Sequence, residues 1–368
     1  MILFSNETII LRIFIGVENI VKKLEESKKI LAEQVVSICV DNSPECLGKI
    51  GEKGKEYCFQ DIVHHFEHLI EAIKVNYPKL FSDYLIWTSK LLEKRGVSAE
   101  DFKANLTLIL KVIENSFDNE FYEKIVPFFN LAQKNLDCDF NEVDTYITID
   151  NPLNEEANKY LKFLLDGERN KAQALIDQLI SNKVDLEMIY LNIFQVTQYE
   201  IGRLWQENKI TVIQEHYCTA STQLIISSLF NKITPKSKKN RFFLAHTLKG
   251  DLHELGARML ADFFEIDGWN THYAGSEISN KQLINYLKEN KVDVLAISIT
   301  QYIYISRLVQ LIKLIREVNE LKKIKILVGG NLFMRDEKLF RDVNADGFAN
   351  SANEAVVLAN SFFINDTV

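Results

Sequence analysis

Hydrophobic residues recur every three or four positions through the first 150 residues of the chain. This is the spacing of amphipathic helices, and it is clearest in Ile9–Leu31, Phe59–Val75, Leu80–Leu92 and Phe102–Ile113. We therefore expect residues 1–150 to form a helical domain. Pro44 and three glycines interrupt the pattern in Asp41–Lys55, which predicts a loop, and the acidic, irregular segment Asp137–Asp150 is expected to be a linker.

The helical spacing continues through residues 153–233, where four further helices are predicted. Asn154 is expected to cap the first of them and Gly167 to end it. Asp185 is expected to cap the third, and Thr211–Phe230 forms the fourth. Residues 153–233 are therefore predicted to fold as a four-helix bundle.

The pattern changes after a short basic linker that ends at Asn240. Short apolar runs, typical of buried strands, now alternate with amphipathic helices; the runs are Arg241–His246, Thr271–Tyr273, Val292–Ile299, Ile324–Val328 and Gly347–Ala349. This alternation predicts a flavodoxin-like, doubly wound parallel sheet of five strands over residues 240–368. The expected fold class is thus multidomain, α plus α/β. Ligands of such sheets bind at the carboxyl ends of the strands.

Composition narrows the classes of function. Of the 368 residues, 47% are hydrophobic and 26% charged, as in soluble globular proteins. A net charge of -8 argues against nucleic-acid binding, and we find no basic recognition helix in residues 1–150. Five scattered cysteines favour reduced thiols, and we see neither a signal peptide nor a spanning helix. We therefore expect a cytoplasmic protein.

The most informative segment directly follows the first predicted strand. It consists of Gly250, Asp251, Leu252, His253, Glu254, Leu255 and Gly256. The order of the elements puts the His253 imidazole at the edge of the sheet where ligands bind. Asp251 can orient that ring and raise its basicity, as metal-ligating histidines require, and Gly256 permits the close approach of a flat ligand.

This segment resembles the D-x-H-x-x-G motif of cobalamin-binding domains, as found in methionine synthase, corrinoid carriers and corrinoid mutases. The resemblance implies that His253 is the lower cobalt ligand and that the displaced nucleotide tail enters a slot in the sheet. Further positions match it: Ser298, Ile299 and Thr300 end the third strand, and Gly329 and Gly330 end the fourth. It also implies a hydrogen-bonded relay of Asp251, His253 and Ser298. A lone histidine in such a loop is more often only a polar residue, and the matches at the other strands favour the ligand.

A second resemblance lies in the predicted bundle. Trp205 is followed ten residues later by Glu215 and then His216. This W-x9-E-H spacing is similar to that of CarH-type light-sensing regulators, which implies that the bundle caps the upper face of adenosylcobalamin. Gln206 stands where that family has a histidine, so the upper ligand after illumination is open between water and a residue such as His216. The alternative is a core tryptophan with a Glu-His pair on the surface.

Together the two resemblances indicate a cobalamin-dependent sensor, with adenosylcobalamin as a light-absorbing cofactor and no enzyme activity of its own. Residues 1–150 would pass the signal to a protein partner or set a homo-oligomer. The chief alternative is a corrinoid carrier subunit of a methyltransferase. A domain that has lost cobalamin and binds only proteins is a third possibility, which the motif residues disfavour.

Residues 1–150 admit two interpretations. They are a dimerisation or docking bundle, or they hold a second chromophore, a bilin, as in photocobilins, which they resemble in architecture alone. His64 and His68 lie one helical turn apart, with Cys58 upstream, and such a set can bind a metal or a tetrapyrrole. A histidine cluster of this kind is more often solvated surface.

Overall fold

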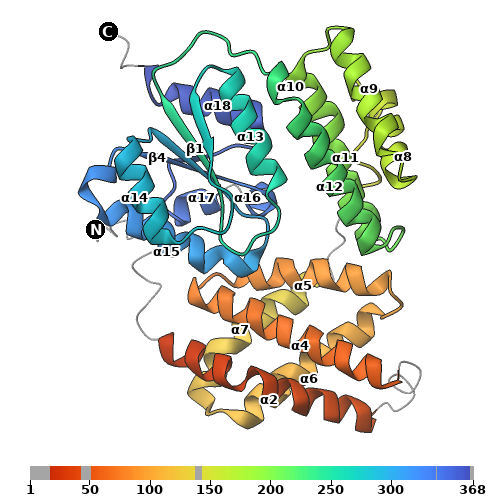
Figure 1. Cartoon of the computed structure of the whole chain (residues 1–368). Helices are drawn as coiled ribbons and strands as arrows, with labels where there is room; N and C mark the ends of the chain where they lie inside the picture. The colour runs from red at the N-terminus through yellow and green to blue at the C-terminus, as the bar shows by residue number, and fades with distance from the viewer. Residues whose placement is uncertain (1–16, 43–50, 137–142, 337, 365–368) are drawn as a thin grey trace. The chain divides into compact units, whose positions relative to one another are not determined.

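Long helices form the described part of the N-terminal region. They are α2 (Glu18–Asn42), α4 (Gly51–Lys74), α5 (Pro78–Glu93), α6 (Ala99–Ser116) and α7 (Asn119–Leu136) (Figure 1). The computed structural model describes residues 17–42, 51–136, 143–336 and 338–364. The start of the helix predicted from Ile9, most of the loop predicted at Asp41–Lys55 and the first part of the predicted linker lie outside these residues.

Local sequence explains where these helices begin. Pro78 occupies the first turn of α5, where its missing N–H costs no hydrogen bond. The Ser98 hydroxyl accepts a hydrogen bond from the Asp101 N–H and so caps α6. Phe66, Phe81 and Phe129 are among the fully buried side chains, so the predicted apolar faces form a core. The helical prediction for this region is confirmed.

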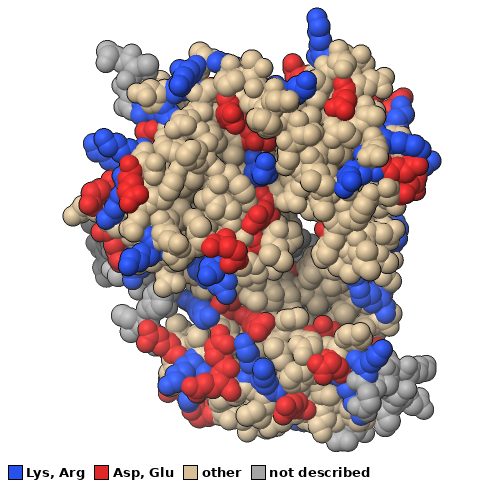
Figure 2. Space-filling view, in the orientation of Figure 1, with Lys and Arg blue, Asp and Glu red and all other residues tan. Residues whose placement is uncertain are grey.

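The chain divides into two units. The first contains Met1–Phe140, Gln301–Lys313 and Asp342–Asn344; the second contains Asn141–Thr300, Leu314–Arg341 and Ala345–Val368. The bundle and most of the sheet region, which were predicted to be separate domains, therefore fall in the same unit. Over the face shown in Figure 2, acidic and basic side chains are interspersed. Among the described residues, no helix has the length and apolarity needed to cross a membrane.

The bundle of the second unit follows the predicted pattern with one irregularity. Its elements are α8 (Asn154–Leu165), α9 (Arg169–Ser181), α10 (Leu186–Ile189), η1 (Tyr190–Gln195), α11 (Val196–Gln206), α12 (Val212–Ser228) and the short η2 (Phe230–Lys232). The third predicted helix is thus α10, η1 and α11 in series, and η1 is a π-helical turn. Thr211 caps α12 in a capping box with Gln214.

The prediction that Asn154 caps α8 is wrong. The cap position is Leu153, and Asn154 is the first residue of the helix. The Asn154 amide instead donates hydrogen bonds to the carbonyl oxygens of Ile147 and Thr148, at 3.3 and 2.6 Å. Residues 147 and 148 had been assigned to a linker. Ile147 is 5% exposed and belongs to the bundle core, so this end of the segment is fastened to the bundle.

The predicted parallel sheet is present. Its strands are β1 (Phe242–Thr247), β2 (Asn270–Tyr273), β3 (Val294–Ser298), β4 (Lys325–Gly329) and β5 (Gly347–Phe348), all parallel, in the order β2-β1-β3-β4-β5. The longer helices between them are α13 (Leu255–Ile266), α14 (Asn280–Asn290) and α15 (Ile305–Glu317), and α18 (Ala352–Ser361) follows β5. Shorter ones are η3 (Tyr302–Tyr304), η4 (Asn319–Leu321), α16 (Asn331–Arg335) and α17 (Leu339–Asp342). The order reverses between β1 and β3, which is where a ligand crevice is expected.

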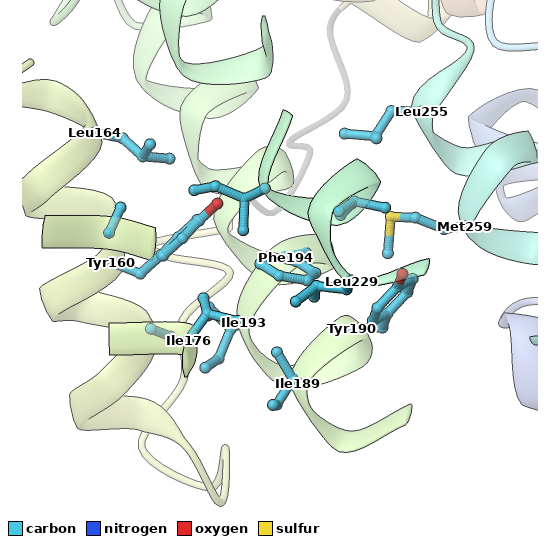
Figure 3. Close-up of a cluster of buried hydrophobic side chains, with 14 of the residues drawn as sticks. Tyr160, Leu164, Ile176, Ile189, Tyr190, Ile193, Phe194, Leu229, Leu255 and Met259 are labelled. Atoms are coloured by element: carbon cyan, nitrogen blue, oxygen red, sulfur yellow. The ribbon is translucent and has the colours of Figure 1, made fainter. Parts of the chain in front are cut away.

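Helix α13 joins the bundle to the sheet. Its residues Leu255, Met259 and Phe263 belong to the same buried cluster as Tyr190 and Phe194 of the bundle. Figure 3 shows Leu255 and Met259 on α13 near Tyr190 and Phe194. Because α13 begins directly after the His253 loop, this shared core brings the bundle next to the candidate site.

Candidate functional site

The loop between β1 and α13 holds His253 through a buried carboxylate. Gly250 has a φ of 95°, a backbone conformation that side chains disfavour, and it lets the chain turn back at the end of β1. Asp251 is 0% exposed. Its Oδ1 lies 2.7 Å from Nδ1 of His253 and accepts a hydrogen bond from the His253 backbone N–H at 3.1 Å. The imidazole is therefore held by the residue two positions before it.

Thr300 completes this arrangement. Its backbone N–H donates to Oδ2 of Asp251 at 2.7 Å, and its hydroxyl lies 2.9 and 2.8 Å from the two carboxylate oxygens. The same hydroxyl is 2.9 Å from Nδ1 of His253. The predicted relay named Ser298 in this place. The hydroxyl in contact with both residues belongs to Thr300, two positions further along, whereas the Ser298 carbonyl accepts a hydrogen bond from the Leu248 N–H.

The electrostatics of the triad suit a metal ligand. Burial acts to raise the pKa of Asp251, but the hydrogen bonds from His253 and Thr300 outweigh it and lower that pKa. The hydrogen bond with Asp251 raises the pKa of His253 against the opposing effect of burial, and the charges of Asp251 and Glu215 add to the increase. Nδ1 is thus engaged with an ionised carboxylate, and Nε2 is the nitrogen available to a metal. The His253 side chain is 57% exposed.

The strand ends beside the loop leave room for a ligand with polar atoms. Thr247, Ser298 and Gly329 are register partners on β1, β3 and β4. The Thr247 hydroxyl is buried and has no hydrogen-bond partner among the described residues. A Cβ added to Gly329 would meet nothing within 4 Å, whereas one added to Gly330 would lie 2.2 Å from the Ile299 carbonyl oxygen. The orphaned hydroxyl and the open space at Gly329 fit a nucleotide tail lying across these strand ends.

The remaining loop residues divide between ligand surface and core. Leu252 is 85% exposed beside His253, and a Cβ at Gly256 would meet nothing within 4 Å, so both leave an apolar, open surface for a flat ligand. Glu254 accepts a hydrogen bond from the Ser276 hydroxyl. Leu255 is buried against the bundle, so its role is packing.

The bundle carries a second group of predicted residues. Trp205 and Gln206 end α11, and Glu215 and His216 lie in the first turns of α12. Glu215 lies near enough for its charge to act on His253. Its carboxylate also contacts Nδ1 of the exposed His216. Glu215 is therefore linked electrostatically to the proposed lower ligand.

The N-terminal histidines are arranged differently from the expected set. His64 is exposed, whereas the His68 ring stacks on Tyr84 with a centroid distance of 3.5 Å. His65, which does not belong to the predicted set, is buried with Nδ1 2.8 Å from the Tyr84 hydroxyl. Burial lowers the pKa of both His65 and His68 to about 3. Within the described ranges, no three His, Cys, Asp or Glu side chains are grouped to hold a metal ion.

Comparison with known proteins identifies the family of two parts of the chain. Residues 243–357 match the model of the B12 binding domain, and residues 156–229 match a second model of the same description. A corrinoid protein of Desulfitobacterium hafniense is 22% identical over 203 residues, which span 54% of this chain and 92% of that protein. Dimethylamine corrinoid protein 1 of Methanosarcina mazei is 24% identical over 129 residues, 35% of this chain and 59% of that protein.

A solved structure supports the fold. The monomethylamine corrinoid protein of Methanosarcina barkeri superposes with a TM-score of 0.52 and 17% identity, covering 57% of this chain and 99% of that protein. At this identity the likeness concerns the fold alone. It accounts for little more than half of the chain.

Proposed function

Because the chain carries two B12-binding domains and is a cobalamin-binding protein, we propose that it is the corrinoid carrier of a methyltransferase. The observation that carries the proposal is the Asp251–His253–Thr300 triad at the carboxyl end of β1. The relatives named as corrinoid proteins, one of them for dimethylamine, favour this function over light sensing. The carrier itself would have no enzyme activity, because a partner methyltransferase would perform the chemistry.

Each residue of the site has a task in such a carrier. When bound, the corrinoid supplies the cobalt that accepts and releases a methyl group. Nε2 of His253 would bind that cobalt, while Asp251 holds the proton on Nδ1 and Thr300 fixes the carboxylate. The open space at Gly329 would take the nucleotide tail. Exposed Leu252 would lie against the ring and exclude water beside the imidazole.

The lower ligand can be tested directly by electron paramagnetic resonance of the Co(II) form, with the protein labelled with 15N in its histidines. We expect the coupling of a histidine nitrogen in the wild-type protein and its loss in His253→Ala. His216→Ala is the matched control and should retain it. Unchanged coupling in His253→Ala would refute the assignment.

The tail slot gives a second test. Gly329→Ala introduces a methyl group into open space, so its free energy of unfolding should stay within about 0.5 kcal/mol of wild type. Its affinity for cobalamin should nevertheless fall at least about tenfold, because the methyl group would occupy the space of the tail. Equal affinity of Gly329→Ala and wild type for cobalamin would place the tail elsewhere.

A light sensor that uses adenosylcobalamin is the second candidate. It is favoured by Trp205, Glu215 and His216 on the bundle, with the charge of Glu215 acting on His253. Absorption spectra with adenosylcobalamin, in the dark and after green light, separate the two functions. A stable, protein-bound photoproduct would favour the sensor, whereas photolysis like that of the free cofactor, with methyl transfer from methylcobalamin to a partner, would favour the carrier.

Two further properties belong to the sensor proposal. A bilin in the N-terminal region would add a far-red absorption band to protein made with a bilin supply. A homo-oligomer would show a multiple of the 42.5 kDa chain mass by light scattering. Absence of the band from such protein, or a monomer mass in dark and light, would remove the respective property.

A further inference from the structure

A chain of hydrogen bonds runs from the bundle core to Glu215. The Tyr160 hydroxyl lies 3.1 Å from the Thr222 hydroxyl, and both residues are fully buried. Thr222 Oγ1 lies 3.0 Å from the Gln198 amide, which is 3.0 Å from the Thr219 hydroxyl. The Thr219 hydroxyl is in turn 3.2 Å from Oε1 of Glu215. This series of hydrogen bonds thus passes from α8 through α12 and α11 to the carboxylate whose charge acts on His253.

Gln198 is the central member of this series. Its NH2 group donates to the Thr222 hydroxyl, and its oxygen accepts from the Thr219 hydroxyl. The Thr219 hydroxyl shares its one hydrogen between this oxygen and Oε1 of Glu215. Gln198 therefore fixes the Thr219 side chain in contact with Glu215.

We propose that Gln198 and Thr219 are positioning residues that hold the Glu215 carboxylate at the upper side of bound cobalamin. A carboxylate fixed there favours aquocobalamin, whose cobalt centre carries an additional positive charge, over methylcobalamin, which lacks that charge. The inference rests on the proposed function, because Glu215 can select between cobalamin forms only if the chain binds them at this site. The Glu215 side chain is 28% exposed, so the effect is that of a partly solvated charge.

The test measures the affinity of the full chain for aquocobalamin and for methylcobalamin. Glu215→Gln and Thr219→Val should each weaken binding of aquocobalamin by about three- to tenfold and that of methylcobalamin by less than about twofold. Thr219→Ser keeps the hydroxyl and should bind as wild type does. Thr197→Val is the matched control, because it makes the same change in the same bundle at a buried hydroxyl with no hydrogen-bond partner among the described residues.

The double variant decides whether Thr219 acts through Glu215. If it does, Thr219→Val should have no further effect in a Glu215→Gln background. Thr219→Val could instead weaken the binding of both cobalamin forms equally, or its effect could add to that of Glu215→Gln in the double variant. Either result would show that these hydrogen bonds only stabilise the bundle and would overturn the proposal. Failure of the wild type to bind either form would instead refute the proposed function.

Discussion

The contact between Tyr190 and Asp262 predicts that the stability of the second unit depends on pH. The Tyr190 hydroxyl on η1 donates to Oδ2 of Asp262 on α13 at 2.8 Å. Burial raises the pKa of Asp262 from 3.8 to about 6. The hydrogen bond from Tyr190 and the charge of Arg258 oppose this increase, whereas the charge of Glu265 adds to it. The folded protein therefore binds a proton here that the unfolded chain has already released.

The sign and size of the effect follow from linkage. A carboxyl group with a raised pKa contributes stability that is fully present below pH 3.8 and is lost as the pH rises through about 6. The difference between the two pKa values corresponds to about 3 kcal/mol, at ~1.36 kcal/mol per pH unit. Because Asp262 is partly exposed, we expect about 1–2 kcal/mol between pH 4 and pH 7.

Asp262→Asn removes the titration and keeps an oxygen that can accept from Tyr190. The free energy of unfolding of Asp262→Asn, relative to that of wild type, should rise by about 1–2 kcal/mol from pH 4 to pH 7. Urea unfolding followed by circular dichroism measures it. Asp177→Asn, at an exposed position on α9, controls for the change in net charge. Parallel pH curves for Asp262→Asn and wild type would refute the reasoning.

Two further predictions concern single contacts. Gly330→Ala should cost about 2 kcal/mol or more of stability and also weaken cobalamin binding, because Gly330 has a φ of 104° and its added Cβ would lie 2.2 Å from the Ile299 carbonyl oxygen. Gly268→Ala is the control, because its added Cβ would lie 2.1 Å from the Ser237 carbonyl oxygen. It should lose stability in denaturant titrations, while its folded fraction binds cobalamin normally. Wild-type stability of Gly330→Ala would contradict the prediction. Tyr84→Phe should cost about 1–2 kcal/mol by thermal unfolding, since buried His65 loses its partner. Tyr217→Phe, which loses an exposed contact with the Gly167 carbonyl, should cost less than about 0.5 kcal/mol, and equal losses in the two variants would contradict the role of burial.

The parallel sheet was predictable because its central strands are short, nearly continuous apolar runs. Strands β1, β3 and β4 are buried on both faces, and that is the composition they show. The His253 loop was predictable from its resemblance to a motif, and Asp251 lies where that motif implied. What could not be predicted was the third member of the triad. The chain leaves β3 at Ser298, and only the path of the next two residues, which no periodicity encodes, brings Thr300 to Asp251.

The N-terminal histidines show a similar limit. The spacing of His64 and His68 places them on the same side of a helix, but the buried side of α4 is set by Ile62, Phe66 and Leu69. His65 lies beside Phe66 on that buried side, so the packing of other helices places it in the core. The apolar positions around it were a signal that could have been used. The π-helical turn η1 was not predicted, because the periodicity of three and four residues predicts one continuous helix there.

The shared core bears on the choice between carrier and sensor. A methyl carrier must expose the upper side of its corrinoid to a partner enzyme, and the bundle that would cover it is packed on α13 through Leu255, Met259 and Phe263. At ~1.5–3 kcal/mol for each buried side chain, full separation of the bundle would cost about 5–9 kcal/mol. A carrier of this sequence must therefore either turn its bundle about α13 without breaking that core or have a partner that covers the exposed side chains. A sensor has no such requirement, because light reaches an enclosed cofactor. Amide exchange in α13 separates a carrier whose bundle detaches from the other two cases. Detachment during methyl transfer would raise exchange at Met259 and Phe263, whereas rotation about α13 or a closed sensor would leave it unchanged.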